Sequence, residues 1–164
     1  MDYSSLSADI KLFWATFLQK TERKSSTTPY GAFYFADTKQ DANELASLVL
    51  SRIKRATASL LWEYKAERQN LPVPGNFSIL TDWDGKPLCV LETVEVSIIP
   101  FEDVDEEFAR IEGEGDGSLA YWREAHWAFF ARECARLGRE PSVRMPIVCE
   151  KFTIVYEPSK NTNK

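Results

Sequence analysis

Hydrophobic residues recur every three or four positions in several stretches of the chain, and this spacing predicts helices with one buried face. The first helix is expected over residues 9–20, with an apolar stripe made of Ile10, Phe13, Trp14, Phe17 and Leu18. A shorter acidic helix is expected over residues 103–111. The last helix starts after Ser118, a residue type that caps helices, and ends at Gly138. Its stripe is Leu119, Trp122, His126, Phe129, Phe130, Cys134 and Leu137.

A further helix begins at Thr38, which with Asp41 resembles a capping box that has aspartate in place of the usual glutamate or glutamine. Its apolar stripe is Ala42, Leu45, Ala46, Val49 and Ile53. We therefore expect this helix to deliver the chain directly to Lys54.

Residues 77–99 show the two-residue alternation of strands instead. A strand over residues 77–83 is followed by Asp84-Gly85, a hairpin signal, and by a second strand whose predicted inward face is Leu88, Val90, Val94, Val96 and Ile98. Glu92 falls on that same face, so it is expected to be paired or to lie near a strand end. A last strand covers residues 146–156.

These elements predict an α+β fold, a small sheet or barrel surrounded by helices. We expect one domain over residues 1–164, with a frayed tail over residues 158–164. A hydrophobic fraction of 44% in 164 residues excludes a disordered chain. The net charge of −5 argues against a nonspecific duplex-DNA coat. A basic first third still leaves room for a pocket that binds one nucleotide or a short single strand.

The three cysteines are widely spaced and form no C-x-x-C pair, so disulfides and a cysteine zinc site are not expected. A single histidine argues against a histidine-metal site as well. No signal peptide opens the sequence, and no apolar run reaches membrane-spanning length. We therefore expect a cytoplasmic protein with no membrane partner.

Candidate chemistry centres on Lys54 and Thr57, because a lysine that sheds its proton beside a hydroxyl is a minimal nucleophile–base pair. The alternative is an exposed lysine next to the first residues of a strand. Asp82 and Trp83 at the hairpin could read and stack a base, or they could serve only the turn. Glu112 closes the acidic helix and is a plausible acid–base carboxylate.

Two further groups of residues are candidate binding sites, and each also has an ordinary structural explanation. Glu112, Glu114 and Asp116 alternate with glycines and could hold a magnesium ion, although they match no calcium-loop pattern; otherwise they form a solvated loop. His126 lies on an apolar helix stripe beside Trp122 and Arg123, and it is either a satisfied core residue or part of a pocket wall.

The order of these pieces resembles an ASCH domain, a branch of the PUA-like superfamily. The resemblance rests on Lys54-x-x-Thr57 after a helix, SLLWEY, PGNFSILTDWDGKPLCVLETVEV, VDEEFARIEGEGD and MPIVCEKFTIVYE, and it spans residues 38–157. The family motif usually has glycine two residues before the lysine, where this chain has Arg52, which would add positive charge near the cleft.

The resemblance implies a PUA-like β-barrel with a cleft between barrel and helices, and RNA or a modified nucleoside as ligand. Small relatives remove acetyl from N(4)-acetylcytidine with a lysine, a threonine and a glutamate, whereas longer relatives are described as ribonucleases acting on single-stranded RNA. These catalytic roles map onto Lys54, Thr57 and Glu112. The ligand-binding positions that we expect around them are Arg52, Ser59, Asp82, Trp83, Trp122, Arg123 and His126.

Three hypotheses follow: a hydrolase (amidohydrolase or ribonuclease) with no required cofactor, a noncatalytic RNA-binding regulatory module, and a domain that binds another small ligand. The retained motif favours the hydrolase. An enzyme needs its three reactive groups in one cleft, whereas a binding module needs only a basic rim and aromatic side chains.

Overall fold

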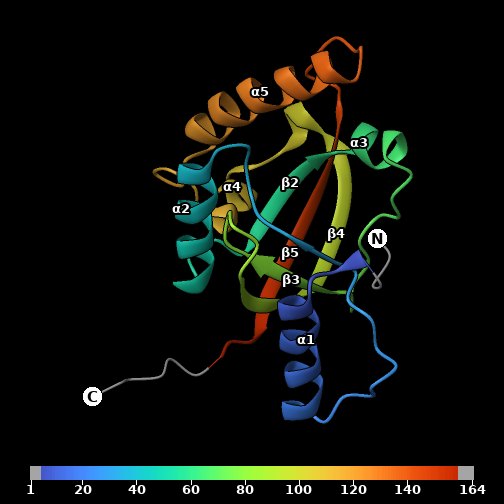
Figure 1. Ribbon diagram of the computed structural model, residues 1–164. Helices are drawn as coiled ribbons and strands as arrows, with labels where there is room; N and C mark the ends of the chain where they lie inside the picture. Colours follow the sequence, from blue (N-terminus) through green and yellow to red (C-terminus); the bar gives the residue numbers. More distant parts are fainter. Residues whose placement is uncertain (1–4, 159–164) are drawn as a thin grey trace.

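The computed structural model describes residues 5–158 as a mixed five-stranded sheet curved into a half-barrel, with helices packed around it (Figure 1). In sequence order its strands are β1 (Gly31–Phe33), β2 (Ala56–Leu60), β3 (Phe77–Thr81), β4 (Pro87–Pro100) and β5 (Pro146–Tyr156). In space the order is β1-β3-β4-β5-β2. β1 runs parallel to β3, and the other neighbours are antiparallel. The predicted α+β class is therefore confirmed.

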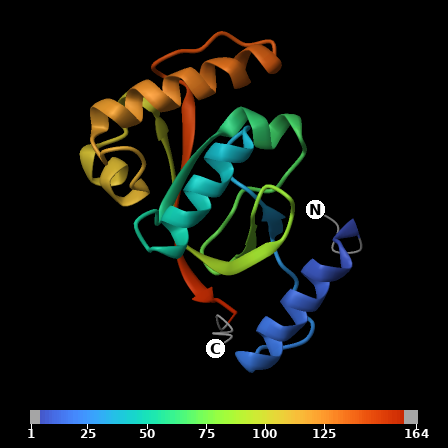
Figure 2. The ribbon, with the colours of Figure 1, turned by 60° about the vertical axis from the view of Figure 1, so that its left-hand side comes forward.

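The helices are α1 (Ala8–Lys20), α2 (Lys39–Leu50), α3 (Leu61–Ala66), α4 (Glu106–Glu112) and α5 (Leu119–Arg136). α5 and α1 lie at opposite ends of the sheet, and α2 lies between them (Figures 1 and 2). The predicted caps form: the hydroxyls of Thr38 and Ser118 accept hydrogen bonds from the backbone N–H groups of Asp41 and Tyr121.

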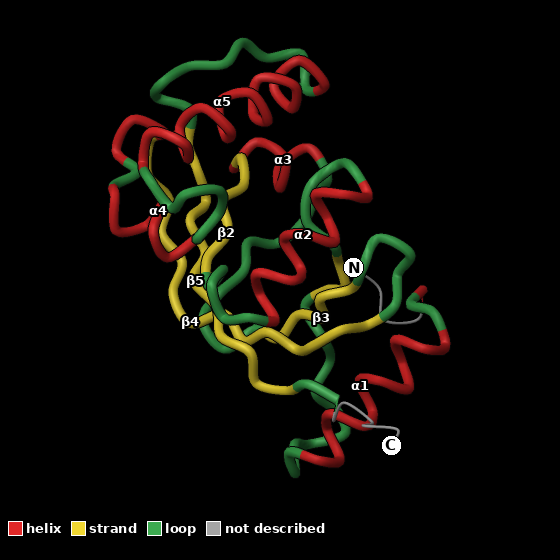
Figure 3. The backbone as a smooth tube through the Cα atoms, turned by 90° about the vertical axis from the view of Figure 1, so that its left-hand side faces the viewer, coloured by secondary structure: helices red, strands yellow, loops and turns green. Residues whose placement is uncertain are grey.

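Each helix layer buries its own apolar cluster, and together these clusters hold the curved sheet. Trp14 and Phe17 of α1 pack on Ile79 and Val90 of the sheet. α2 covers a second cluster with Ala46 and Val49. α4 and α5 close a third over β2 and β5, which contains Phe108, Trp122, Phe130, Ala56 and Cys149. Figure 3 shows α2 lying in front of the sheet, between α5 and α1.

The predicted inward face of β4 is wrong beyond its midpoint. Val94 is 51% exposed and Ile98 is 45% exposed, whereas Leu91 and Thr93 are buried. The reason is that β4 shifts register against β5 between Val90 and Leu91 and again between Thr93 and Glu95. Each such bulge adds a residue to one strand and breaks the two-residue alternation.

Two short elements, β1 and α3, were not predicted, because three and six residues are too few to show a period. The acidic helix begins later than expected, at Glu106, after a 3-10 turn over Phe101–Asp103. Apart from Pro158, the tail expected to fray lies outside the described residues. None of the helices between residues 5 and 158 combines the length and the apolar character that a membrane crossing requires.

The end of α2 explains how Lys54 reaches the interior. Arg52 adopts a left-handed φ of 60°, and its N–H bonds to Val49 O while the N–H of Ile53 bonds to Leu48 O. This is the Schellman arrangement, which normally selects glycine, and it accounts for the glycine that the family motif has there. α2 therefore ends at Leu50, and not at Ile53 as expected. The chain changes direction at Arg52, so the Lys54 side chain is buried in the core.

Gly113, at the end of α4, is predicted to be the glycine least tolerant of a side chain. Its φ is +69°, and an added Cβ would lie 2.7 Å from Ile53 O. Gly138 has a similar φ of +66°, and an added Cβ there would meet nothing within 4 Å. A substitution at Gly138 therefore measures only the cost of the left-handed backbone conformation. Gly138→Ala should lower the free energy of unfolding by about 1–2 kcal/mol, and Gly113→Ala clearly more. Denaturant unfolding of both variants tests this, and equal losses would contradict it.

Candidate functional site

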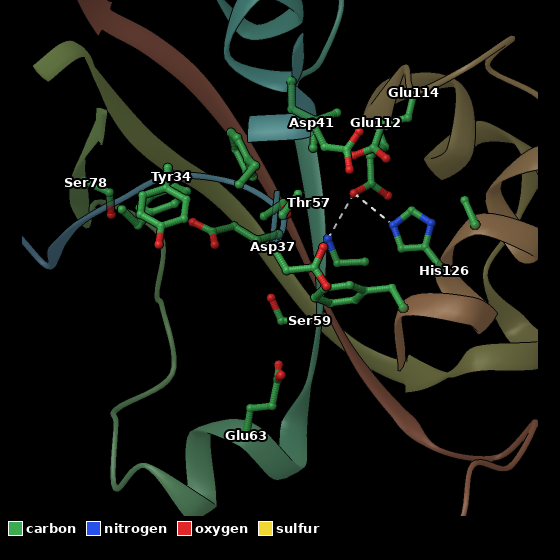
Figure 4. Close-up of a pocket in the computed structure, with 18 of the residues that line it drawn as sticks. Tyr34, Asp37, Asp41, Thr57, Ser59, Glu63, Ser78, Glu112, Glu114 and His126 are labelled. Carbon is green, nitrogen blue, oxygen red and sulfur yellow. Dashed lines mark hydrogen bonds and ion pairs between the residues drawn. The ribbon is translucent and has the colours of Figure 1, made fainter. Parts of the chain in front are cut away.

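A cavity of about 850 Å³ opens between α2, β2, α3 and α5. Thr57 and Ser59 line it from β2, and they share one face because they are two residues apart on a strand. Glu112, Glu114 and His126 gather at one end of the cavity, while Glu63 lies at the other end beyond Ser59 (Figure 4). The structure thus brings four of the ten expected site residues, Thr57, Ser59, Glu112 and His126, to one hollow.

Lys54 lies just beneath this cavity and is completely buried, with a side chain that is 0% exposed. Its Nζ donates to Glu112 Oε1 at 3.1 Å and to Glu114 Oε1 at 2.6 Å. The ring of Phe35 adds a cation–π contact, with its centroid 5.0 Å from Nζ. Burial disfavours the charged form, but the two carboxylates outweigh burial and raise the pKa of Lys54.

Glu112 is the most strongly held of the acidic side chains. Its Oε1 accepts from Lys54 Nζ and from the backbone N–H of Ala58 at 3.1 Å, and it lies 3.4 Å from His126 Nε2. Its Oε2 accepts from Trp122 Nε1. Burial alone would raise the pKa of Glu112, but Lys54 and His126 outweigh burial and lower this pKa to about 2.

His126 is oriented from both sides. Its Nδ1 lies 2.9 Å from Trp122 O, and its ring stacks on the Trp122 indole with centroids 4.2 Å apart. Burial opposes its protonation, but Glu112 raises the pKa of His126 above its ordinary value of 6.5. The histidine is therefore both a satisfied buried residue and part of the cavity wall.

These contacts correct one expectation about Lys54. We predicted a lysine that loses its proton readily and pairs with the Thr57 hydroxyl. In this structure the described hydrogen bonds of Nζ go to Glu112 and Glu114 instead, and both carboxylates favour the ammonium form. The motif placed the lysine correctly, but it carried no information on the two acids.

Four of the predicted ligand-binding residues lie away from the cavity lining. Arg52 pairs with Glu157 at 2.7 Å and adds no charge to the cavity. Arg123 donates to the Glu102 carbonyl at 3.1 Å. Asp82 accepts from Lys86 N within the hairpin, and Trp83 packs on Tyr34 with ring centroids 4.8 Å apart. The contacts of Asp82 and Trp83 are therefore those of an ordinary hairpin turn.

Trp122, which was expected among the ligand-binding residues, also lies away from the cavity lining. It is 2% exposed. Its ring instead supports His126, and its N–H holds Glu112. Trp122 therefore holds His126 and Glu112 in position without lining the cavity itself.

The proposed magnesium ligands do not fit that ion. Glu112, Glu114 and His126 bring ligand atoms within 4.8 Å of one another, but Lys54 Nζ bonds both carboxylates there. Asp116 is turned away, since its Oδ1 accepts from Ser118 N at 2.8 Å. Magnesium needs an octahedral oxygen shell, and this position already holds an ammonium group.

The cavity wall is strongly acidic, which no pattern in the sequence indicates. Among the described residues, eight carboxylates line the cavity against one arginine: Asp37, Asp41, Glu44, Glu63, Glu67, Glu112, Glu114 and Glu150. The arginine, Arg132, pairs with Asp37 at 3.1 Å. The acids come from four separate stretches of the chain, residues 37–44, 63–67, 112–114 and 150, so only the fold brings them together.

Glu150 lies directly opposite Thr57 in the β2–β5 ladder. Opposed residues on antiparallel strands have neighbouring side chains. The Glu150 carboxylate accepts from Thr93 Oγ1 at 2.6 Å, and burial raises its pKa. Sequence reasoning missed Glu150, since strand register cannot be read from one chain.

Replacing Glu112 tests the buried charge network. Glu112→Gln leaves Lys54 without its most strongly held partner, so the free energy of unfolding at neutral pH should fall by about 3–5 kcal/mol. The lowered pKa of Glu112 stabilises the wild type fully above pH 4.5, and this stabilisation is lost as the pH falls towards about 2. The free energy of unfolding of Glu112→Gln should therefore fall less steeply between pH 4.5 and about 2 than that of the wild type.

Urea unfolding between pH 2 and 7 measures both effects. Glu44→Gln is the control, because Glu44 lines the same cavity but is exposed, and it should change stability by less than about 0.5 kcal/mol. A Glu112→Gln variant that behaves like this control would contradict the account.

Known proteins identify the family. A model of the ASCH domain matches residues 31–156. The crystal structure of an ASCH domain from Lactobacillus crispatus superposes with a TM-score of 0.89 at 38% identity, covering 96% of this chain and 100% of that chain. A protein from Enterococcus faecalis gives a TM-score of 0.81 at 35% identity, covering 90% of this chain and 88% of that chain. No curated protein sequence matches significantly. This chain therefore belongs to the ASCH domain family of PUA-like fold, whose members are generally thought to bind RNA.

Proposed function

We propose that this protein is an amidohydrolase that removes an acyl group from a neutral modified nucleoside of the N(4)-acetylcytidine type. The observation that carries the proposal is the acidic cavity that contains Thr57 above the buried Lys54–Glu112 pair. A hydroxyl nucleophile and a carboxylate line a hollow large enough for a nucleoside, and the lysine is bound to that carboxylate just behind the lining.

The charge of the wall favours a neutral ligand over an RNA strand. Two unit charges 4 Å apart interact by about 1 kcal/mol in water and by more in a partly buried site. A phosphodiester near Thr57 would face Glu112 and Glu114, with Arg132 already paired to Asp37. Burial keeps protons on Glu63 and Glu150 to higher pH, with the pKa of Glu63 raised to about 7. The six remaining carboxylates still outnumber Arg132, His126 and the buried Lys54 together.

The proposed reaction is acyl transfer to Thr57 followed by hydrolysis. The Thr57 oxygen attacks the acyl carbon while its proton passes to the amine form of Lys54. The C–N bond then breaks, and Lys54 returns the proton to the leaving nitrogen. Water finally hydrolyses the threonine ester, which releases the carboxylic acid and restores Thr57. Glu112 holds Lys54 in place throughout.

A second candidate is a noncatalytic module that binds RNA or a nucleoside. The observation in its favour is the ammonium form of Lys54, which two carboxylates stabilise. Such a lysine needs to lose a proton before it can accept one from Thr57. A binding module would have no such requirement.

Turnover of N(4)-acetylcytidine by the purified protein tests the proposal. Thr57→Val keeps the shape of the side chain but removes the hydroxyl, and it should reduce kcat by about a thousandfold or more. Thr153→Val is the matched control, since Thr153 is an exposed β-strand threonine that does not line the cavity, and it should retain wild-type turnover.

A single-stranded RNA oligonucleotide is assayed in parallel, with and without magnesium. We expect no cleavage of RNA. Full deacetylation by Thr57→Val would refute the nucleophile, and RNA cleavage that is lost in Thr57→Val would replace the amidohydrolase by a ribonuclease. If neither substrate is converted while the nucleoside binds, the noncatalytic module is the better account.

A further inference from the structure

The two carboxylates that bind Lys54 are held very differently. Glu112 has a side chain that is 1% exposed and accepts from Lys54, the Ala58 N–H and Trp122. Glu114 is 18% exposed, and between residues 5 and 158 the hydrogen bond that it accepts comes from Lys54. Glu112 is therefore fixed, whereas Glu114 depends on a single contact.

Glu114 also separates Lys54 from the cavity. Both Glu112 and Glu114 line the cavity, but Lys54, which they bind, does not. Of these two acids, Glu114 is the more exposed and makes the shorter contact with Nζ, 2.6 Å against 3.1 Å. Moving the Glu114 carboxylate aside would thus open the ammonium group to whatever occupies the cavity.

The chain around Glu114 allows such a movement on one side and resists it on the other. Gly113 packs closely against the backbone just after α2, since an added Cβ there would lie 2.7 Å from Ile53 O. Gly115 has a φ of +56° and lies under the Tyr121 ring, with a hypothetical Cβ 2.4 Å from that ring. Tyr121 is 42% exposed, so its ring can yield more easily than the backbone of Ile53. The backbone of Ile53 therefore restricts Glu114 on the Gly113 side, whereas only the Tyr121 ring covers the Gly115 side.

We propose that Glu114 is a displaceable cover of Lys54, and that a ligand entering the cavity moves this carboxylate aside and converts Lys54 into the amine that Thr57 requires. This inference rests on the proposed function. It makes Glu114 a positioning residue, because it acts through Lys54 rather than on the substrate.

The proton balance follows from the short contact. The ammonium of Lys54 gives its proton to Glu114 Oε1, the Glu114 carboxyl moves into the cavity mouth, and it releases that proton to solvent. Lys54 is left as a neutral amine that stays buried beside Glu112. Among the described residues, the charged or titratable groups that act on it are then Glu112 from α4, which it contacts, and His126 from α5, which lies 3.4 Å from Glu112; the centroid of the Phe35 ring lies 5.0 Å from Nζ. Since Glu112 remains, the amine can still accept the Thr57 proton.

Substituting Glu114 tests this role. Glu114→Gln keeps the size of the side chain but removes one of the two charges that stabilise the ammonium form of Lys54. Asp116→Asn is the matched control, since it neutralises a carboxylate of the same loop while an amide oxygen can still accept from Ser118 N. Two readouts are used, and one of them is independent of enzyme activity.

The first readout is the rate at which acetic anhydride labels Lys54 at pH 8, followed by peptide mass spectrometry. Only a free amine reacts, and one pKa unit changes the amine fraction about tenfold. Labelling of Lys54 should be at least about tenfold faster in Glu114→Gln than in the wild type or in Asp116→Asn. Equal rates in all three proteins would overturn the proposal.

The second readout is the pH dependence of kcat/KM for N(4)-acetylcytidine. Activity that requires the amine form rises with pH, and Glu114→Gln should move the midpoint of this rise to lower pH by about one unit or more. An unchanged midpoint in an active variant would also overturn the proposal. Faster labelling in a protein that never turns over would support Glu114 as the cover of Lys54 while refuting the amidohydrolase.

Discussion

A lysine ammonium and a glutamate carboxylate, both out of contact with water, set the constraint on which the rest of this structure depends. Removing Lys54 and Glu112 from water is costly unless each finds a partner of opposite charge. The Nζ–Oε1 contact of 3.1 Å meets that requirement, and the Ala58 N–H and Trp122 Nε1 satisfy the carboxylate further. The ends of α2 and α4, the start of β2 and the first turns of α5 are thereby held in one arrangement.

The same constraint shapes what the cavity can do. Because Glu112 is committed to Lys54 and to backbone and indole donors, it is a weak base with a low pKa. In the proposed mechanism Lys54 exchanges the proton, and Glu114, which accepts a hydrogen bond from it, controls its ionisation state. In the proposed function, the acidic wall around Thr57 disfavours a phosphate-bearing ligand, in contrast to the basic grooves that track a nucleic-acid backbone. Under the proposed function, these charges favour chemistry on a neutral amide.

Sequence and resemblance together located much of this arrangement, and the failures have physical causes. Helical periodicity placed α1 and α5 because both helices bury long apolar stripes, and the Lys54-x-x-Thr57 motif placed the lysine and the hydroxyl. The register shifts in β4 left no trace in the pattern, so Val94 was assigned to the wrong face. Trp122 was expected to bind ligand because a helix stripe does not distinguish a side chain that lines a cavity from one buried behind the lining. Glu150 and Glu63 were missed because they join the cavity through strand pairing and a short helix.

The ionisation state of Lys54 is the most direct test of this account. Nitrogen-15 NMR of the Lys54 side chain, followed from pH 7 upwards, reports whether Nζ is an ammonium or an amine. The two carboxylates predict that Nζ stays an ammonium beyond pH 10.5, the ordinary lysine value, in the protein without ligand. A titration of Nζ well below pH 10.5 would contradict the buried ion pair at the centre of the account, and it would restore a lysine that sheds its proton without any movement of Glu114.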